Sequence, residues 1–320
     1  MTKLEIANLL KNKSILITGG TGFFGKNLCE FLVEINREFN SNIKIYSMAR
    51  RKVAIEGVSF LEQDLTKEIS IHLEIDFVIH TATPVVNDKS TSNELLSIII
   101  NGTQNIISWS KLNKVKKILF ISSGAVYGAQ PSEIKKVDES YFEKVPVFDE
   151  NNAYASGKRI SELMAYSLLK DSSVEFSIAR GFAFSGKYLA LDQHFAIGNF
   201  VKDAIDGKKI KVKGDGTAIR SYMDNIDLCF WTLAILLKGR SLEAYNLGSD
   251  QEITIKELAL TISRMVPGTE VQIENEKNSV IKSNRYVPST EKAQSELNLK
   301  LTVTLEESIQ KMLEIYRKER

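Results

Sequence analysis

The sequence predicts an α/β protein built on a doubly wound parallel sheet, and three observations point to this fold class. Strand-like and helix-like segments alternate along residues 1–180. The strand-like segments are continuous apolar runs, which is typical of parallel strands covered by helices on both faces. After residue 180 the alternation breaks, and glycine-containing turns separate shorter, more polar segments. We therefore expect a Rossmann-type sheet with a smaller C-terminal α/β lobe that closes over it.

The expected elements follow in chain order. An amphipathic helix precedes a strand that stops at glycines, and the next helix carries an apolar stripe at helical spacing. The division predicted from them is a sheet domain of residues 1–180 plus about 221–250, and a lobe of about 181–220 plus 251–320. Helices are expected at 1–12, 22–35, 93–112, 153–170, 255–265 and 305–317, and strands at 14–18, 43–48, 58–61, 76–80, 117–122, 174–179 and 245–248.

Composition argues against several classes of protein. Lysine and arginine total 42 against 40 acidic residues, a balance that does not favour a nucleic-acid or membrane surface. Cys29 and Cys229 lie in apolar helical patterns and are expected to be buried thiols, and the three scattered histidines predict no metal site. The start of the chain lacks a signal-peptide pattern, and the longest apolar run, 228–237, is about half the length of a membrane span. We expect a cytoplasmic protein.

A glycine turn lies between the first predicted strand and the next helix. Gly19, Gly22 and Gly25 are spaced as G-x-x-G-x-x-G. Glycines in this context let the backbone approach a pyrophosphate, and the following helix presents unpaired N–H groups to that anion. The turn therefore predicts binding of a dinucleotide.

The segment from Thr18 to Gly25 resembles the extended short-chain dehydrogenase/reductase family, the NAD-dependent epimerase/dehydratase family, whose members mostly act on nucleotide sugars. Further matches are Asp64-Leu65, His80-Thr-Ala-Thr83 and Asn101-Gly-Thr103, and the resemblance extends from about Ser14 to about Lys292. It implies cofactor contacts from Gly19, Thr21, Gly22, Phe23, Phe24, Gly25, Asp64, Leu65, Thr81, Ala82, Thr83, Tyr154, Lys158 and Phe182.

The end of the second strand bears on which nicotinamide cofactor is used. An NAD site usually has an acidic residue there to bind the ribose 2′-hydroxyl. Here Arg50 and Arg51 stand at that place, and no acid occurs before Glu56. An arginine pair can hold a 2′-phosphate instead, although the alternative of two surface charges stays open. NADP(H) is therefore favoured over NAD(H).

Three residues match the active site of the family. Tyr154 and Lys158 are four residues apart on one predicted helix, and Ser123 follows the fifth strand. By the resemblance, Lys158 binds the nicotinamide ribose and lowers the pKa of the Tyr154 phenol. Tyr154 then exchanges a proton with the sugar oxygen, and Ser123 hydrogen-bonds the same oxygen.

The residues after Ser123 narrow the reaction. The family's 4,6-dehydratases carry Asp-Glu there, and its glucuronate decarboxylases use a Glu, but this chain has Gly124 and Ala125. Neither can transfer a proton, so hydride transfer alone remains. With the arginine pair, we predict an NADPH-dependent reductase of a nucleotide-linked 4-keto-6-deoxyhexose in surface-polysaccharide synthesis, for example dTDP-4-dehydro-6-deoxyglucose reductase. A 4-epimerase that retains NAD and a non-catalytic dinucleotide sensor stay as alternatives.

Substrate contacts are expected from the lobe. Arg220 matches the family's diphosphate-binding arginine, Asn199 and Phe200 match a segment near the nucleotide, and Asp227 is expected to cap the following helix. Arg285 is either a second diphosphate ligand or a surface charge. The Asn that often touches substrate in the family is Ala183 here, and His194 could replace that contact or be structural. The resemblance also implies a homodimer through the helices that include 101–112 and 154–170.

Overall fold

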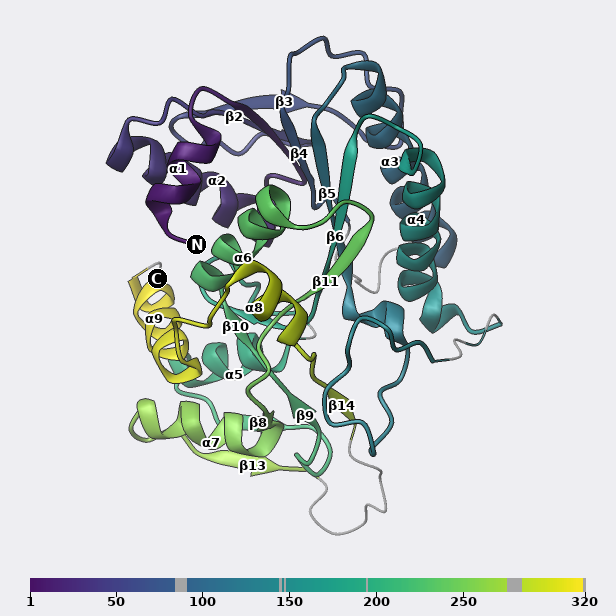
Figure 1. Ribbon diagram of the computed structural model, residues 1–320. Helices are drawn as coiled ribbons and strands as arrows, with labels where there is room; N and C mark the ends of the chain where they lie inside the picture. The colour runs from purple at the N-terminus through teal and green to yellow at the C-terminus, as the bar shows by residue number, and fades with distance from the viewer. Residues whose placement is uncertain (84–90, 144–145, 147, 194, 275–283, 319–320) are drawn as a thin grey trace.

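A parallel sheet forms the centre of the computed structural model, which describes residues 1–83, 91–143, 146, 148–193, 195–274 and 284–318 (Figure 1). Its seven strands have the order β11-β6-β5-β4-β1-β2-β3, and every neighbouring pair is parallel. The chain runs outward from β1 to β2 and β3, then returns with β4 on the other side of β1, as in doubly wound folds. The predicted fold class is confirmed. The strands are β1 (Ser14–Thr18), β2 (Lys44–Ala49), β3 (Val58–Glu62), β4 (Phe77–His80), β5 (Lys117–Ser123), β6 (Glu175–Gly181) and β11 (Glu243–Leu247).

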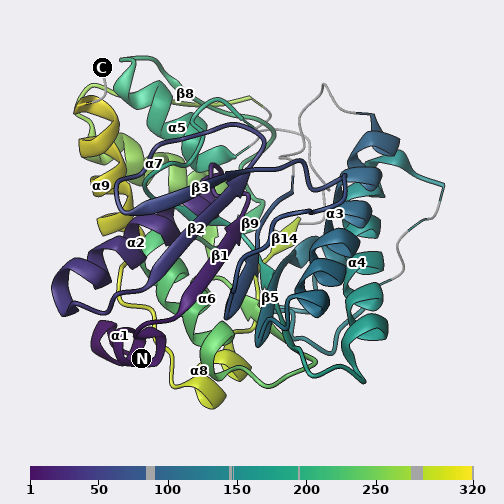
Figure 2. The same ribbon diagram turned by 90° about the horizontal axis from the view of Figure 1, so that it is seen from above.

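Helices cover both faces of this sheet, which explains the unbroken apolar runs of its strands. In β1, Ile15 and Ile17 belong to one buried cluster and Leu16 belongs to another. Figure 2 shows α3 and α4 on one side of the sheet and α1, α2, α6 and α8 on the other. Within the described ranges, no helix combines the length and apolar character that crossing a membrane requires. These helices are α1 (Lys3–Leu10), α2 (Phe23–Phe39), α3 (Ser92–Leu112), α4 (Ala153–Leu169), α6 (Asn225–Lys238) and α8 (Glu291–Leu297).

The C-terminal lobe has a hydrophobic core of its own, below the sheet in Figure 1. Phe200, Ile262 and Met312 bring α5, α7 and α9 together in this core. Small sheets β13-β8, β12-β9-β14 and β10-β7 complete the lobe and its junction with the sheet. The elements are β7 (Phe184–Ser185), α5 (Ala196–Ile205), β8 (Ile210–Val212), β9 (Ile219–Arg220), β10 (Met223–Asp224), β12 (Ile253–Thr254), α7 (Ile255–Met265), β13 (Val271–Ile273), β14 (Arg285–Tyr286) and α9 (Leu305–Lys318).

Some elements differ from the sequence-based expectation. Helix α2 runs to Phe39 rather than ending at residue 35, and α5, α8 and the short lobe strands were not predicted. Helix α8 packs on β11 and α6, and its Ala293 and Leu297 belong to the core of the main sheet, although the predicted division assigns 251–320 to the lobe. Cys29 and Cys229 are buried free thiols, as predicted.

The expected helix cap at Asp227 is wrong. Asp224 is the N-cap of α6, and its carboxylate accepts the N–H of Ile226 at 2.9 Å. Asp227 lies within the first turn and instead accepts the backbone N–H groups of Thr302 and Val303, at 2.8 Å and 3.1 Å. Its carboxylate therefore ties α6 to the segment before α9, a structural role of a different kind.

Candidate active site

The glycine turn joins β1 to α2 at the point where the strand order changes. Gly19 has φ +69°, a conformation that favours glycine. A Cβ atom on Gly19 would lie 2.8 Å from Cα of Ala82, and one on Gly25 would lie 2.4 Å from the carbonyl oxygen of Gly19. At both positions a side chain would therefore collide with main-chain atoms. This is the fit expected of a turn that lets a pyrophosphate approach the main chain closely.

The first turn of α2 carries no side-chain cap. Its N-cap is Gly22, whereas Thr2, Thr91 and Thr254 close capping boxes at the starts of α1, α3 and α7. The leading N–H groups of α2 and the positive end of its dipole thus face the turn. The rings of Phe23 and Phe24, in this first turn, pack against Phe184. Thr21 lies in the turn itself, and the cofactor contacts of these residues stay predictions.

The end of β4 lies directly against the glycine turn. The Thr81 hydroxyl donates to the carbonyl oxygen of Thr18 at 2.7 Å, and Ala82 meets Gly19 as described above. The Thr83 hydroxyl accepts a hydrogen bond from Nζ of Lys158 at 2.6 Å. The fold thus brings three segments predicted to contact one cofactor to the same edge of the sheet.

Arg50, Arg51, Asp64 and Leu65 lie on the other side of β1, after β2 and β3. Both arginines are exposed, and neither forms an ion pair with a carboxylate of the described residues. The Asp64 carboxylate accepts the N–H and hydroxyl of Thr66, at 3.0 Å and 2.8 Å. The Thr66 N–H lowers the pKa of Asp64, and the charge of Arg50 adds to the effect. The arginine pair remains available to an anion.

Strand β5 and helix α4 bring the three predicted catalytic residues together. Ser123 ends β5, and its hydroxyl accepts the N–H of Ala125 at 3.2 Å. Tyr154 lies in the first turn of α4, close enough to Ser123 for that hydroxyl to lower the pKa of the phenol. Nζ of Lys158 is 6.0 Å from the centre of the Tyr154 ring and donates to the carbonyl oxygen of Ile121 at 2.8 Å. The arrangement can hold a substrate oxygen beside two hydroxyl groups and a cation.

Burial controls the proton equilibria of this trio. It raises the pKa of the Tyr154 phenol, and the hydrogen bond from Ser123 partly offsets that rise. Lys158 is not among the causes of this shift. Its ammonium group donates to the Thr83 hydroxyl and to the carbonyl oxygen of Ile121. Burial lowers the pKa of Lys158 to about 7, against the opposing charge of Glu162. Tyr154 therefore holds its proton at neutral pH.

Because its pKa is lowered in the fold, Lys158 is expected to reduce the free energy of unfolding by an amount that depends on pH. Between about 7 and its ordinary value of 10.5, the unfolded chain binds more protons at this site than the fold. The free energy of unfolding contributed by Lys158 therefore rises with pH through that window. Lys158→Met should stabilise the cofactor-free protein near pH 6 by up to about 5 kcal/mol, since one pKa unit corresponds to about 1.36 kcal/mol. The gain should vanish above about pH 10.5.

Urea unfolding of wild type and Lys158→Met at both pH values measures this effect. Lys170→Met, which replaces an exposed lysine just after α4, is the control and should show no such dependence. A Lys158→Met protein less stable than wild type near pH 6 would show that burial does not penalise this ammonium.

Two aromatic side chains enclose the residue that follows Ser123. A Cβ atom on Gly124 would lie 2.7 Å from the hydroxyl oxygen of Tyr286 and 2.8 Å from Cζ of Phe182. The two rings pack with centroids 4.7 Å apart. An acidic side chain at this position would have to displace one of these rings. The packing of Tyr286 and Phe182 therefore fits a glycine after Ser123 and leaves no space for an acid.

Sequence reasoning missed Tyr286. It belongs to β14, a strand of two residues in which no periodicity can be detected. The family resemblance singled out its neighbour Arg285, but nothing in the local sequence indicates that the adjacent phenol reaches Gly124.

Arg220 and Arg285 lie on the β12-β9-β14 sheet, with Arg220 opposite Tyr286 in the pairing of β9 and β14. Arg220 is partly buried and donates to the carbonyl oxygens of Ile219 and Asn284, at 2.8 Å and 2.7 Å. Burial lowers its pKa. Arg285 pairs with Glu252 at 2.5 Å, so an incoming diphosphate would compete with that carboxylate.

The other residues predicted to bind substrate are Asn199, Phe200 and His194. The Asn199 amide donates to the carbonyl oxygen of Gln193 at 2.7 Å, and Phe200 is buried in the lobe core. His194 lies outside the described residues. The substrate roles of these three residues remain predictions.

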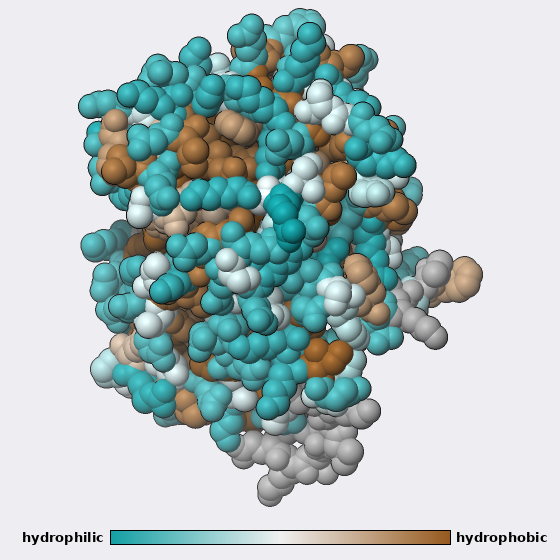
Figure 3. Space-filling view, in the orientation of Figure 1, coloured by the Kyte–Doolittle hydropathy of each residue, from teal (hydrophilic) through white to brown (hydrophobic). Residues whose placement is uncertain are grey.

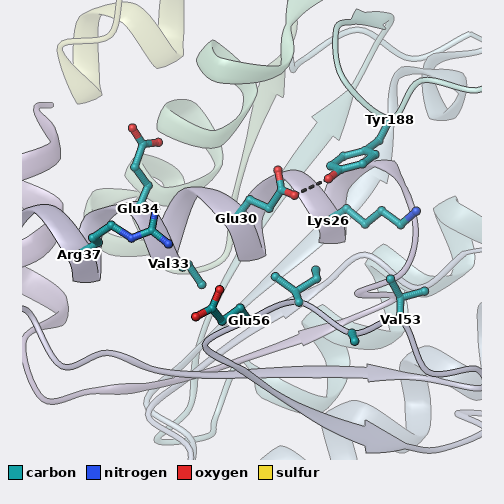
Figure 4. Close-up of a pocket in the computed structure, with 10 residues that line it drawn as sticks. Lys26, Glu30, Val33, Glu34, Arg37, Val53, Glu56 and Tyr188 are labelled. Carbon is teal, nitrogen blue, oxygen red and sulfur yellow. Dashed lines mark hydrogen bonds between the residues drawn. The ribbon is translucent and has the colours of Figure 1, made fainter. Parts of the chain in front are cut away.

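A hollow of about 450 Å³ lies on the outer side of α2 and contains none of the predicted site residues. Figure 4 shows Glu30 on α2, which accepts a hydrogen bond from the Tyr188 hydroxyl, and Glu56 on the segment after β2. Glu34, also on α2, belongs to the same lining. Carboxylates outnumber the cations Lys26 and Arg37 in this lining. The hollow therefore does not suit an anionic ligand.

Comparison with known proteins points to one protein family. The sequence profile of the NAD dependent epimerase/dehydratase family matches residues 15–248. UDP-glucuronic acid decarboxylase 1 of Xenopus tropicalis is 28% identical over 314 residues, which cover 96% of this chain and 73% of that protein. UDP-glucuronic acid decarboxylase 3 of Arabidopsis thaliana is also 28% identical, over 96% of this chain and 90% of that protein.

Solved structures show the same fold. UDP-glucose 4-epimerase of Thermotoga maritima, with UDP-glucose, superposes with a TM-score of 0.81 at 20% identity and covers 96% of this chain and 99% of that one. RMD of Pseudomonas aeruginosa, complexed with NADPH, gives 0.78 at 21% identity, over 96% of this chain and 100% of that one. At these identities the similarity concerns the fold alone.

Proposed function

Because the chain belongs to the NAD dependent epimerase/dehydratase family, we propose that it is an NADP(H)-dependent 4-ketoreductase of a nucleotide-linked 4-keto-6-deoxyhexose. A nicotinamide dinucleotide as cofactor and a nucleotide sugar as substrate class follow from the family. The reductase assignment rests chiefly on Gly124, because Tyr286 and Phe182 fill the space where an acid beside Ser123 would stand. By the family resemblance, elimination of water uses Asp-Glu after this hydroxyl and decarboxylation uses a Glu, whereas this chain has Gly124 and Ala125. Neither reaction is therefore supported, although the decarboxylases named above are relatives.

The residues suit a reduction. When bound, the nicotinamide ring supplies the hydride. Tyr154, whose pKa is raised by burial, keeps the proton that a newly reduced C4 oxygen needs. Ser123 hydrogen-bonds the same oxygen and strengthens that contact as negative charge develops. Lys158 would hold the nicotinamide ribose from its place beside Thr83.

A panel of nucleotide sugars and their 4-keto derivatives, offered with NADPH or NADH, tests the assignment. We expect NADPH absorbance to fall only with a 4-keto sugar, and the product to gain two hydrogen atoms. Interconversion of two epimers without consumption of cofactor would instead identify a 4-epimerase, which likewise needs no acid at position 124. Cofactor binding without turnover of any sugar would identify a sensor.

The arginine pair supports NADP(H) over NAD(H), and Arg50→Ala tests it. Removing the guanidinium should weaken NADPH binding by about 10-fold to 100-fold, the range expected for a lost charge-assisted hydrogen bond. NADH, which lacks the 2′-phosphate, should bind about as before. Calorimetric titration with each cofactor measures both constants, and Lys52→Ala removes a neighbouring exposed cation as the control. Equal losses for NADPH and NADH would remove the case for NADP(H).

We also propose that two copies associate through α3 and α4. Ile160, Leu163 and Tyr166 of α4 and Leu112 at the end of α3 are large apolar or aromatic side chains that lie exposed. Figure 3 shows apolar side chains at the right-hand edge of the molecule, over α4. Exposed apolar groups that gather on one face favour a protein partner, and a second copy fits the homodimer that the family resemblance implies.

A further inference from the structure

The loop that follows β3, residues 63–68, lies where the fold would receive the adenosine half of the cofactor. In a doubly wound sheet the pyrophosphate lies at the turn after β1, and the adenosine ribose lies at the end of β2. Strand β3 comes next in the order β1-β2-β3. The backbone N–H of Gln63, just after β3, donates to the carbonyl oxygen of Ala49 at the end of β2, at 3.1 Å. The adenine is therefore expected beside this loop.

Helix α3 holds the loop through one side chain. The amide nitrogen of Asn105 donates to the carbonyl oxygens of Leu65 and Lys67, at 2.8 Å and 3.1 Å. Because both partners are carbonyl oxygens, they fix the orientation of the amide group and use both of its hydrogens. A hydroxyl has one hydrogen and an ionised carboxylate has none, so neither could make this pair of bonds.

The bond to Leu65 sets the direction of the next amide group. In a trans peptide unit the C=O and N–H bonds point to opposite sides, and the described residues contain no cis peptide bond. With the Leu65 oxygen bound to α3, the Thr66 N–H points away from that helix and donates to Oδ1 of Asp64 at 3.0 Å. The Thr66 hydroxyl donates to the same oxygen at 2.8 Å. The orientation of the Asp64 carboxylate thus depends on the peptide that Asn105 holds.

We propose that Asn105 is a positioning residue of the adenosine end of the cofactor site, which fixes the Leu65–Thr66 peptide and through it the Asp64 carboxylate. This role rests on the cofactor site of the proposed function and extends that site to α3, a helix that carries none of the residues predicted to contact the cofactor. Without the amide, the peptide can rotate, and the Thr66 N–H loses its fixed direction toward Asp64.

Asn105→Ala removes the amide and should raise the dissociation constant of adenosine diphosphate (ADP) about tenfold, the effect of losing one oriented hydrogen bond. ADP is common to NAD(H) and NADP(H), so the result does not depend on the arginine pair. Nicotinamide mononucleotide, the other half of the cofactor, should bind as it does to wild type. Calorimetric titration measures both constants. The Gln63 amide still holds the carbonyl oxygens of Asp64 and Glu68, at 2.8 Å and 3.2 Å, so the ends of the loop stay in place.

A double substitution tests whether Asn105 acts through Asp64. Asp64→Ala should weaken ADP by itself, and residues of one network do not give additive losses. Asn105→Ala combined with Asp64→Ala should therefore bind ADP no more weakly than Asp64→Ala alone. Asn105→Asp is the second variant if Asn105→Ala fails to fold, because it keeps the volume of the side chain and loses both donated hydrogens. It should weaken ADP at least as much.

Asn36→Ala is the matched control. The Asn36 amide on α2 makes two hydrogen bonds of 2.8 Å with the backbone of Ile43, just before β2 and so at the amino edge of the sheet. Thermal unfolding should show a lower melting temperature for both Asn36→Ala and Asn105→Ala, whereas the affinity for ADP should fall only in Asn105→Ala.

These measurements separate the possible failures. Unchanged affinity for ADP in Asn105→Ala or Asn105→Asp would reduce Asn105 to a structural residue and overturn the proposal. Additive losses in the double variant, or an equal loss for nicotinamide mononucleotide, would overturn it as well. If wild type binds ADP but turns over no sugar of the panel, the proposed function fails, and the titrations still decide the role of Asn105.

Discussion

Tyr154→Phe should abolish turnover while leaving cofactor affinity within about twofold of wild type. The ring is retained, so its packing at the start of α4 persists, but the proton donor is gone. Loss of a positioned general acid lowers rates by about 10²-fold to 10⁴-fold. Single-turnover measurement of cofactor oxidation with the preferred sugar, together with a fluorescence titration of the cofactor, separates the chemical step from binding.

Tyr141→Phe is the control for this substitution. Its hydroxyl contacts Glu143 at 2.9 Å and belongs to no part of the proposed site, so turnover should be unchanged. Near-normal turnover of Tyr154→Phe would end its assignment as proton donor and leave Ser123 as the residue to test next.

Gly25→Ala should abolish cofactor binding and destabilise the fold. The added Cβ would lie 2.4 Å from both the carbonyl oxygen of Gly19 and Cα of Gly20, and backbone atoms cannot yield as a flexible side chain can. The turn must open, which removes the close approach that a pyrophosphate needs. Overpacking of this kind costs about 1–3 kcal/mol of stability, and we expect the cofactor dissociation constant to rise at least about 100-fold, or about 2.7 kcal/mol.

Gly102→Ala is the matched control, since a Cβ on this glycine of α3 would lie an ordinary 3.6 Å from Cβ of Leu65. Alanine in a helix interior should preserve or raise the melting temperature. Calorimetric titration and thermal unfolding of both variants provide the comparison. If Gly25→Ala binds cofactor as wild type does, the pyrophosphate lies elsewhere.

Local sequence signals located the sheet half of the molecule well. The strand before Gly19, the helix after Gly22 and the helix of Tyr154 and Lys158 all carry their own apolar periodicity, because each packs against the same sheet along its length. The parallel order then places their ends at one edge without further information. For this reason the predicted turn and trio could be named before their positions in space were known.

The lobe was less predictable, for physical reasons. Its strands β9, β12 and β14 have two residues each, too few for any hydrophobic period. Two aspartates lie near the start of α6, and only their contacts in the fold distinguish Asp224, which caps the helix, from Asp227, which accepts the N–H of Thr302. Chain folding alone brings the Tyr286 hydroxyl to Gly124. The lowered pKa of Lys158 likewise depends on its complete burial, which spacing along α4 does not reveal.

The enclosure of Gly124 has a consequence for how this site could change its chemistry. An acid at position 124 would bring a carboxylate against the Tyr286 hydroxyl and the Phe182 ring. A viable intermediate would first need a smaller residue at position 286 or 182, and that change would undo the packing of these two rings. Conversion between the proposed reduction and elimination would thus need at least two dependent changes, at positions that lie far apart in the chain.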